Sequence, residues 1–345
     1  MSYFIELLQG GWNGLLSYLS AHVITCLVPA LFIAGAIAAF VSQGAILKYF
    51  GPQAKKVVSY SIASVSGAVL AVCSCTVLPL FAGIYKKGAG LGPAIAFLYS
   101  GPAINVLAIV YSAKLLGYDI GIGRAVGAIV FSVVVGLIMA FIYRKDKSKG
   151  DAKAFAMLAT EPAGKSIWQQ ILFIGSLVGV LIFAASKNWI VMGIFLAAVI
   201  VILWRWFTKG EIVVWLKETL HFTRLIIPWL LLGVFLAGIL TVVIPPDVVA
   251  QWVGGNSLLA NFIASFAGAL MYFATLTEVP IVKAFMELGM GKGPAMALLL
   301  AGPSLSLPAM FTLTKIMGFK KMITYVSIVV VMATLTGYIF GLISG

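Results

Sequence analysis

Long apolar runs separated by short polar segments dominate the chain. A helix needs about 20 mostly apolar residues to cross the hydrocarbon core of a bilayer. Two apolar regions, residues 57–116 and 257–317, are interrupted by glycine and proline, whereas the other runs are continuous. The continuous runs cover about residues 23–41, 123–143, 167–186, 189–207, 225–244 and 325–343. The pattern predicts an all-α polytopic membrane protein.

The glycine and proline breaks recur at one fixed spacing of 201 residues. Paired breaks in two halves of a chain are a sequence indication of a transporter's binding site. The matched positions are Gly67-Ala68 with Gly268-Ala269, Pro79 with Pro280, Gly92-Pro93 with Gly293-Pro294, Gly101-Pro102 with Gly302-Pro303, and Gly117 with Gly318. We therefore expect two transmembrane repeats, residues 21–143 and 222–345. Residues 144–221 then form a cytoplasmic linker and an extra two-helix transmembrane hairpin.

The basic residues predict opposite orientations for the two repeats. Lys48, Lys55 and Lys56 follow the first span of the first repeat, whereas the matching loop, residues 245–256, has no basic residue and carries Asp247. Lysine and arginine concentrate in cytoplasmic loops. One loop is therefore expected inside and its counterpart outside, as in an inverted-topology repeat. This topology requires an odd net number of crossings in each interrupted region, and we expect one full crossing plus one re-entrant or broken pair of helices in each.

The composition agrees with a membrane protein and excludes several other classes. The chain is 62% hydrophobic and 10% charged, against about 45–50% and about 25% in soluble proteins. The net charge of +13 lies in short loops, so nucleic acid is not an expected partner. The first 20 residues lack a signal-peptide pattern and are expected to form an interfacial helix anchored by Trp12 and Tyr18. Neither a nucleotide-binding motif nor a cofactor motif is present, so a gradient is the expected energy source.

The Gly-Pro pairs are expected to begin new helices inside the membrane. Proline suits the first helical position, and glycine permits the preceding turn. Helix N-termini at Pro79, Pro93, Pro102 and their matched prolines would then direct free N–H groups into a central site. Ordinary kinks in packed spans are the alternative. Asn105 and Ser306 occupy matched positions beyond the breaks; these two residues, like Tyr99, Ser100 and Ser304, either line the site or bond across helices.

Two cysteines lie close together in the run Cys73-Ser74-Cys75-Thr76-Val77-Leu78-Pro79. The residues before a proline favour extended backbone, in which side chains two positions apart share one side. Two thiols on one side could bind a soft metal or metalloid. Alternatively, both are small buried apolar side chains, as Cys26 is expected to be. A disulfide within so small a ring is not expected.

Glu278 occupies the matching segment of the second repeat, Thr277-Glu278-Val279-Pro280. A carboxyl group inside the membrane is costly and indicates a functional site. Glu278 is therefore a candidate proton carrier, with a hydrogen-bonded structural carboxyl as the alternative. Arg124 is interpreted as an anchor at the membrane edge. His22 and His221 are expected to have interfacial roles.

The cysteine run followed by Gly92-Pro93-Ala94 and Ser100-Gly101-Pro102-Ala103-Ile104-Asn105 resembles the ArsP/YraQ (DUF318) family of predicted permeases. The segments Thr277-Glu278-Val279-Pro280 and Ala301-Gly302-Pro303-Ser304 resemble it too, and the similarity covers nearly the whole chain. Characterised members export trivalent organoarsenicals. The resemblance implies that Cys73 and Cys75 bind arsenic(III).

We expect a multi-pass permease of the inner (cytoplasmic) membrane that exports organoarsenicals by proton-coupled alternating access. The alternatives are a transporter of another small solute, such as a sulfur compound or an anion, and a thiol-redox membrane protein. An enzyme and a resident cofactor are not expected; the partners are a small-molecule substrate and the lipid bilayer, and the sequence sets no oligomeric state. The predicted substrate-binding residues are Cys73, Cys75, Thr76, Pro79, Gly101, Pro102, Asn105, Thr277, Pro280, Gly302, Pro303, Ser304 and Ser306, with Glu278 for proton coupling.

Overall fold

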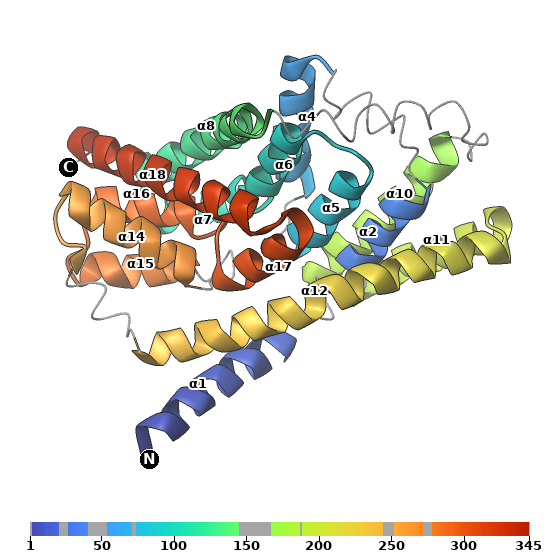
Figure 1. Ribbon diagram of the computed structural model, residues 1–345, viewed down its shortest axis with the longest axis horizontal. Helices are drawn as coiled ribbons and strands as arrows, with labels where there is room; N and C mark the ends of the chain where they lie inside the picture. The colour runs from blue at the N-terminus through green and yellow to red at the C-terminus, as the bar shows by residue number, and fades with distance from the viewer. Residues whose placement is uncertain are drawn as a thin grey trace.

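The computed structural model describes residues 2–20, 27–40, 54–70, 74–144, 167–186, 188–243, 252–271 and 278–344 (Figure 1). These residues form 15 helices, which confirms the prediction of an all-α protein. In chain order the helices are α1 (Ser2–Tyr18), α2 (Val28–Phe40), α4 (Lys56–Leu70), α5 (Ser74–Lys86), α6 (Leu91–Ala103), α7 (Val106–Leu116), α8 (Tyr118–Ile142), α10 (Ile167–Ala185), α11 (Trp189–Trp206), α12 (Lys209–Val243), α14 (Leu258–Leu270), α15 (Glu278–Glu287), α16 (Lys292–Ala301), α17 (Leu307–Met317) and α18 (Phe319–Ser344).

Four of the described helices are long and apolar enough to cross a membrane alone: α8, α11, α12 over Lys209–Ile239, and α18. Helix α6 and Ala108–Leu116 of α7 are bent by 47° and make a fifth span if the pair is one broken crossing. Shorter apolar helices, α2 and α10, occupy the other two predicted runs. The chain is therefore a multi-pass membrane protein whose exposed apolar side chains contact lipid.

The longest helix, α12, organises one side of the protein. Helices α2, α10 and α11 gather along its N-terminal half, and α1 crosses its C-terminal half (Figure 1). Glycines make the crossing with α1 close, because a Cβ atom on Gly14 would lie 3.2 Å from the Cα atom of Gly238. Tyr18 of α1 is 2% exposed, so its predicted role as an interfacial anchor is wrong; Trp12 is exposed.

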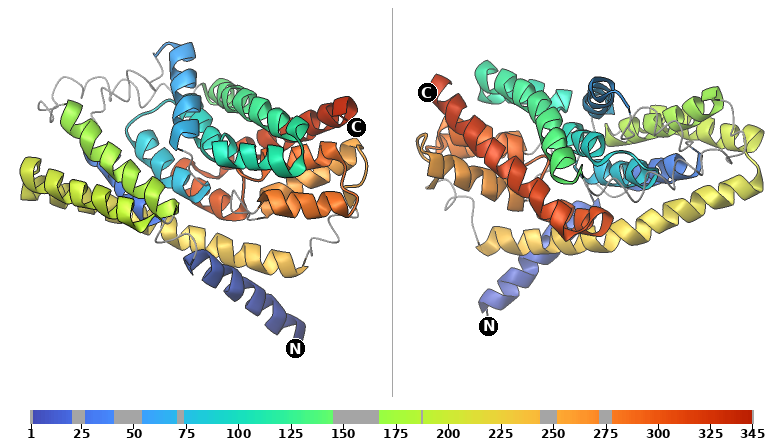
Figure 2. Two further views of the ribbon diagram at one scale, coloured as in Figure 1. Left: turned by 180° about the vertical axis from the view of Figure 1, so that it is seen from behind. Right: turned by 45° about the horizontal axis from the view of Figure 1, so that its top comes forward.

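The other side consists of two helix groups, α4–α8 and α14–α18, that share their order and part of their packing (Figure 2). Helix α6 packs against α4 and α8, and α16 packs against α14 and α18. Each packing has one close glycine crossing. A Cβ atom on Gly136 of α8 would lie 2.6 Å from the Gly92 carbonyl oxygen, and one on Gly337 of α18 would lie 2.7 Å from that of Gly293. The repeated glycines of the sequence are therefore points of close helix contact.

Further conformational features recur in the two groups. Gly88 and Gly117 have positive φ angles of 91° and 117°, and their matched residues Gly289 and Gly318 have φ angles of 104° and 89°. A residue with a Cβ atom rarely adopts this backbone conformation. Each matched pair therefore terminates a helix in the same way in both groups.

The long helices α8 and α18 lie side by side and run in opposite directions (Figures 1 and 2). At one end, the Tyr143 hydroxyl after α8 donates to the Lys320 carbonyl at the start of α18, at 2.9 Å. At the other end, Lys292 is 3.1 Å from Asp119, at the start of α8, and donates to the Ser344 carbonyl at the end of α18. The two equivalent helices α8 and α18 are thus antiparallel.

Candidate functional site

Two helix breaks face each other at the contact between the helix groups. The first separates α6 from α7, and the second separates α16 from α17. The Asn105 side-chain oxygen accepts a hydrogen bond from the Ala108 N–H at 3.4 Å, and the Ser306 hydroxyl accepts one from the Ala309 N–H at 3.3 Å. An N-cap side chain of this kind satisfies a free N–H at the start of a helix. Asn105 and Ser306, at matched positions, thus each cap the helix that follows its break.

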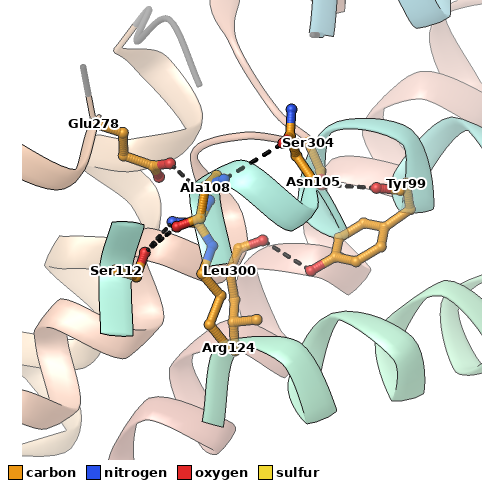
Figure 3. A network of polar contacts seen from close by, with 8 residues as sticks. All are labelled: Tyr99, Asn105, Ala108, Ser112, Arg124, Glu278, Leu300 and Ser304. Atoms are coloured by element: carbon orange, nitrogen blue, oxygen red, sulfur yellow. Dashed lines mark hydrogen bonds and ion pairs between the residues drawn. The ribbon is translucent and has the colours of Figure 1, made fainter. Parts of the chain in front are cut away.

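Hydrogen bonds connect the two breaks directly. The Tyr99 hydroxyl donates to the Leu300 carbonyl at 2.9 Å, although these residues are 201 positions apart and therefore equivalent (Figure 3). The Ser304 hydroxyl donates to the Tyr99 carbonyl at 3.3 Å, and the Tyr325 hydroxyl donates to the Ser304 carbonyl at 3.2 Å. Tyr99 and Leu300 are equivalent residues of the two groups, so their contact marks a point at which equivalent parts of the groups meet.

A buried ion pair lies beside the breaks. Arg124 of α8 places one terminal guanidinium nitrogen 3.1 Å from a Glu278 carboxylate oxygen at the start of α15 (Figure 3). The other terminal nitrogen donates to the Ser112 hydroxyl at 2.9 Å, and Ser112 donates to the Ala108 carbonyl of α7 at 2.7 Å. The side chains of Arg124 and Glu278 are 0% and 1% exposed. A charged contact between the two helix groups is thus fully enclosed by protein.

The ion pair is incompletely satisfied within the described residues. The Arg124 Nε atom and the Glu278 Oε1 atom have no hydrogen-bond partner there. Gly302, at the second break, leaves room for this carboxylate, because a Cβ atom on Gly302 would lie 2.7 Å from Oε1. Buried charged groups with unused hydrogen-bonding capacity are costly. This arrangement is consequently suited to gain or lose a proton, a water molecule or a polar ligand.

The interpretation of Arg124 as an anchor at the membrane edge is wrong. Its guanidinium is enclosed and pairs with Glu278, so it does not reach the membrane surface. The sequence held a usable signal, because Arg124 lies in an apolar run, as Glu278 does. Charged residues inside a membrane are usually paired. A lone charge in an apolar run therefore indicates a buried partner of opposite charge, without identifying that partner.

The prolines do not all begin helices as predicted. Pro93, Pro280 and Pro294 are third residues of α6, α15 and α16, where proline fits because the first N–H groups of a helix need no partner within it. Pro79 lies inside α5, Pro102 is the last residue but one of α6, and Pro303 lies in the turn between α16 and α17, so their predicted helix N-termini are wrong. A helix starting at Ser74 loses only one backbone hydrogen bond at Pro79.

The prediction of extended backbone before Pro79 is also wrong for residues 74–79, since these belong to α5. Cys73 and Thr277 lie outside the described residues, as does Cys26, and of Cys75 the structure describes only the helical backbone. The predicted convergence of the two thiols is therefore not tested. Most other predicted site residues are buried, whereas Pro280 is exposed. The buried ones are Thr76, Pro79, Gly101, Pro102, Asn105, Gly302, Pro303, Ser304 and Ser306.

The described residues hold no group of three or more histidine, cysteine, aspartate or glutamate side chains that could bind a metal ion. What they bring together is one buried cation, one buried anion, two capped helix starts and two tyrosine hydroxyls. These groups can bind a small polar or charged solute and can exchange one charge partner for another. They belong to helices of both groups, so relative movement of the groups would change the site.

Comparisons with known proteins identify the family of the chain. The chain is 47% identical over 363 residues to the UPF0718 protein MJ0584 of Methanocaldococcus jannaschii, an alignment covering 99% of this chain and 98% of the relative. It is 23% identical over 251 residues to the UPF0718 protein YraQ of Escherichia coli strain K12, covering 73% of this chain and 58% of YraQ. No solved structure matches the chain. The model of the ArsP_1 family, described as a predicted permease, matches residues 10–342. The chain therefore belongs to the ArsP_1 family of predicted permeases.

Proposed function

We propose that this permease exports trivalent organoarsenicals in exchange for protons across the inner (cytoplasmic) membrane. Membership of a permease family makes the chain a transporter rather than an enzyme. The observation that carries the coupling mechanism is the ion pair of Arg124 and Glu278, which is buried at the contact between the two helix groups. The choice of substrate rests on Cys73 and Cys75 and on the resemblance to organoarsenical exporters.

Alternating access would come from two repeats of opposite orientation, residues 21–143 and 222–345. The antiparallel arrangement of α8 and α18 supports this proposal, and so does the contact between equivalent residues Tyr99 and Leu300. In many transporters, inverted repeats move against each other around a site near the midplane. Residues 144–221 would then be the cytoplasmic linker and an added hairpin, and residues 1–20 an interfacial helix.

Glu278 is the proposed proton carrier, and Arg124 is its partner in the conformation seen here. A proton on the carboxylate would remove its charge and weaken its attraction to the guanidinium. The groups could then separate as the two repeats move. Because Arg124 also bonds Ser112 of α7, its release would free the helix that follows the first break. Proton uptake would thereby be linked to a change at the contact between the repeats.

The substrate step is a condensation. A species RAs(OH)₂ and the two thiols of Cys73 and Cys75 would form two As–S bonds and release two water molecules, with no change in oxidation state. Hydrolysis on the other side would reverse the step and restore both thiols. Thiolate sulfur is the ligand type that such soft centres prefer. The substrate route would be lined by Thr76 and Pro79 and by the residues around Gly101–Asn105, Thr277–Pro280 and Gly302–Ser306.

Uptake of methylarsenite into everted vesicles tests the proposal. Vesicles with wild-type protein should accumulate the arsenical when a proton gradient is present, and Cys73→Ser should abolish uptake. Cys26→Ser is the matched control and should transport normally. Glu278→Gln should remove the dependence on the gradient. Absence of wild-type uptake would exclude the arsenical, and equal wild-type uptake without a gradient would exclude proton coupling.

A second candidate substrate is a small anion. The buried Arg124 guanidinium, whose Nε atom lacks a partner among the described residues, favours this alternative. The starts of α7 and α17 add N–H groups with partial positive charge. An anion transporter should keep its activity in Cys73→Ser and lose it in Arg124→Gln. An arsenical exporter should instead lose arsenical transport in Cys73→Ser and be less sensitive to Arg124→Gln.

A further inference from the structure

A cavity of about 480 Å³ lies between α4, α6 and α8, well away from the ion pair. Its rim carries Lys56 at the start of α4 and Arg144 just after α8, and both side chains are exposed. Arg144 is 20 residues beyond Arg124 along the chain, which corresponds to about 30 Å of helix. The cavity is consequently at one end of the membrane-spanning helices and not at the helix breaks.

The walls of the cavity differ from its rim. Leu137 and Phe141 of α8 form part of the wall, and both are exposed on the outer face of the protein, Phe141 to 75%. Ser59 and Tyr60 add two hydroxyl groups below the cations. No acidic side chain occurs among the described residues that line the cavity. The site thus combines a cationic, hydrogen-bonding rim with an apolar wall open to lipid.

The second helix group packs different side chains at the matched positions. The residues that match Tyr60, Gly92 and Ala140 of the cavity wall are Asn261, Gly293 and Gly341. In the second group, the Asn256 side chain lies against Gly293 and Gly341. Asn256 also donates to the Tyr338 carbonyl and accepts a hydrogen bond from Asn261, both at 3.0 Å. Asn256 thus lies against Gly293 in the second group, as the Tyr60 hydroxyl lies against Gly92 in the first.

We propose that this cavity binds the headgroup of an anionic phospholipid. Lys56 and Arg144 would hold the phosphate, the Tyr60 hydroxyl beside Gly92 lies within the same cavity, and an acyl chain would lie along Leu137 and Phe141. Basic pockets between transmembrane helices are known to take anionic headgroups, and the cavity is in the volume range of small-ligand sites. A soluble solute on a transport route would have no use for a wall that faces outward into lipid.

Lipid binding to the purified full-length protein tests the proposal, with phosphatidylglycerol and phosphatidylcholine titrated in detergent and bound lipid counted by native mass spectrometry. The wild type should bind phosphatidylglycerol at least tenfold more tightly than phosphatidylcholine. Each cation near a membrane surface contributes about fivefold, so the double variant Lys56→Gln/Arg144→Gln should bind about 25-fold more weakly. The matched control is Arg205→Gln/Lys217→Gln, which removes the same charges from exposed positions on α11 and α12.

The outcomes separate a lipid site from general attraction. Retention of wild-type affinity in the control, with loss in the double variant, supports the proposal. Equal affinity for the two lipids, or an equal loss in both double variants, would overturn it. A third measurement is competition between inorganic phosphate and phosphatidylglycerol. Displacement of phosphatidylglycerol by an equal concentration of phosphate would assign the cavity to a free anion and would also overturn the lipid proposal.

Discussion

Breaking the buried ion pair should destabilise the protein strongly, whereas removing both charges should cost much less. Arg124 and Glu278 are 3.1 Å apart and essentially unexposed. Removal of one partner leaves the other charge buried and uncompensated, which costs about 3–5 kcal/mol, while replacement of both by neutral groups is often close to neutral. Glu278→Gln and Arg124→Gln should therefore each lower the free energy of unfolding by about 3–5 kcal/mol. The double variant should recover at least about 2 kcal/mol relative to the sum of the single losses.

Reversible unfolding in mixed micelles measures these free energies, with fluorescence of the eight tryptophans as the signal. The pair of Lys86 and Glu218 provides an internal control. Its nitrogen–oxygen distance is 2.6 Å, but its side chains are 43% and 27% exposed. Solvent screening limits such a pair to about 0.2–1 kcal/mol. The reasoning is refuted if the losses from Arg124 and Glu278 are additive, or if their coupling is no larger than that of the exposed pair.

Three further outcomes are expected. Gly302→Ala should reduce transport and lower stability by about 1–3 kcal/mol, because its Cβ atom would lie 2.7 Å from the buried carboxylate; unchanged transport kinetics would contradict this role. Gly318→Ala should lower the free energy of unfolding by about 1 kcal/mol, because Gly318 has a positive φ of 89°, and open space surrounds it. Thermal unfolding measures this loss, and Gly193→Ala, at a helical glycine that also faces open space, should be neutral or stabilising. Single cysteines at the matched positions Lys86 and Glu287 should react with impermeant maleimide from opposite sides of the membrane, and labelling from one side would exclude inverted repeats.

The sequence predicted the membrane spans because these depend on local patterns, and the inverted repeat stays a prediction. Apolar runs, paired glycines and prolines are all visible without tertiary contacts. The structure explains why these glycines must recur, since Gly92 and Gly293 each allow the same close helix crossing. The prolines were less informative, because proline is accepted both in the first turn of a helix and near its end. Pro79 and Pro102 illustrate how one residue type fits several helical positions.

The start of α12 could also have been read from the sequence. Thr208 and Glu211 form a capping box, in which the Glu211 carboxylate accepts from the Thr208 N–H at 2.7 Å and the Thr208 hydroxyl accepts from the Glu211 N–H at 3.4 Å. Thr-x-x-Glu is a known signal for a helix start. The predicted span began at residue 225, whereas the charged residues between 209 and 224 lie on the same helix, which continues to Val243.

The pairing of Arg124 with Glu278 could not be located from sequence alone. These residues are 154 positions apart, and their contact depends on how α7 packs against both α8 and α15. Local patterns identify a costly charge but not the helix that supplies its partner. The cavity near Arg144 is similar, because a hollow depends on which side chain fills the space between helices. Only comparison of the two packed groups reveals that Asn256 lies against Gly293 where the Tyr60 hydroxyl lies against Gly92.

The two repeats share their backbone breaks but not their charges. The position that matches Arg124 is Tyr325, and the position that matches Glu278 is Val77; both are buried and uncharged. A site built from two equivalent breaks would favour neither side of the membrane if its side chains were equivalent as well. In the proposed alternating-access cycle, this ion pair would make the two arrangements of the helix groups unequal in energy, because only one pairing of helices would satisfy both buried charges. A proton or a charged solute that removes this inequality would then shift the balance between the two arrangements. In that cycle, the matched glycines would allow the helix groups to move against each other, and the unmatched charges would give this movement a direction.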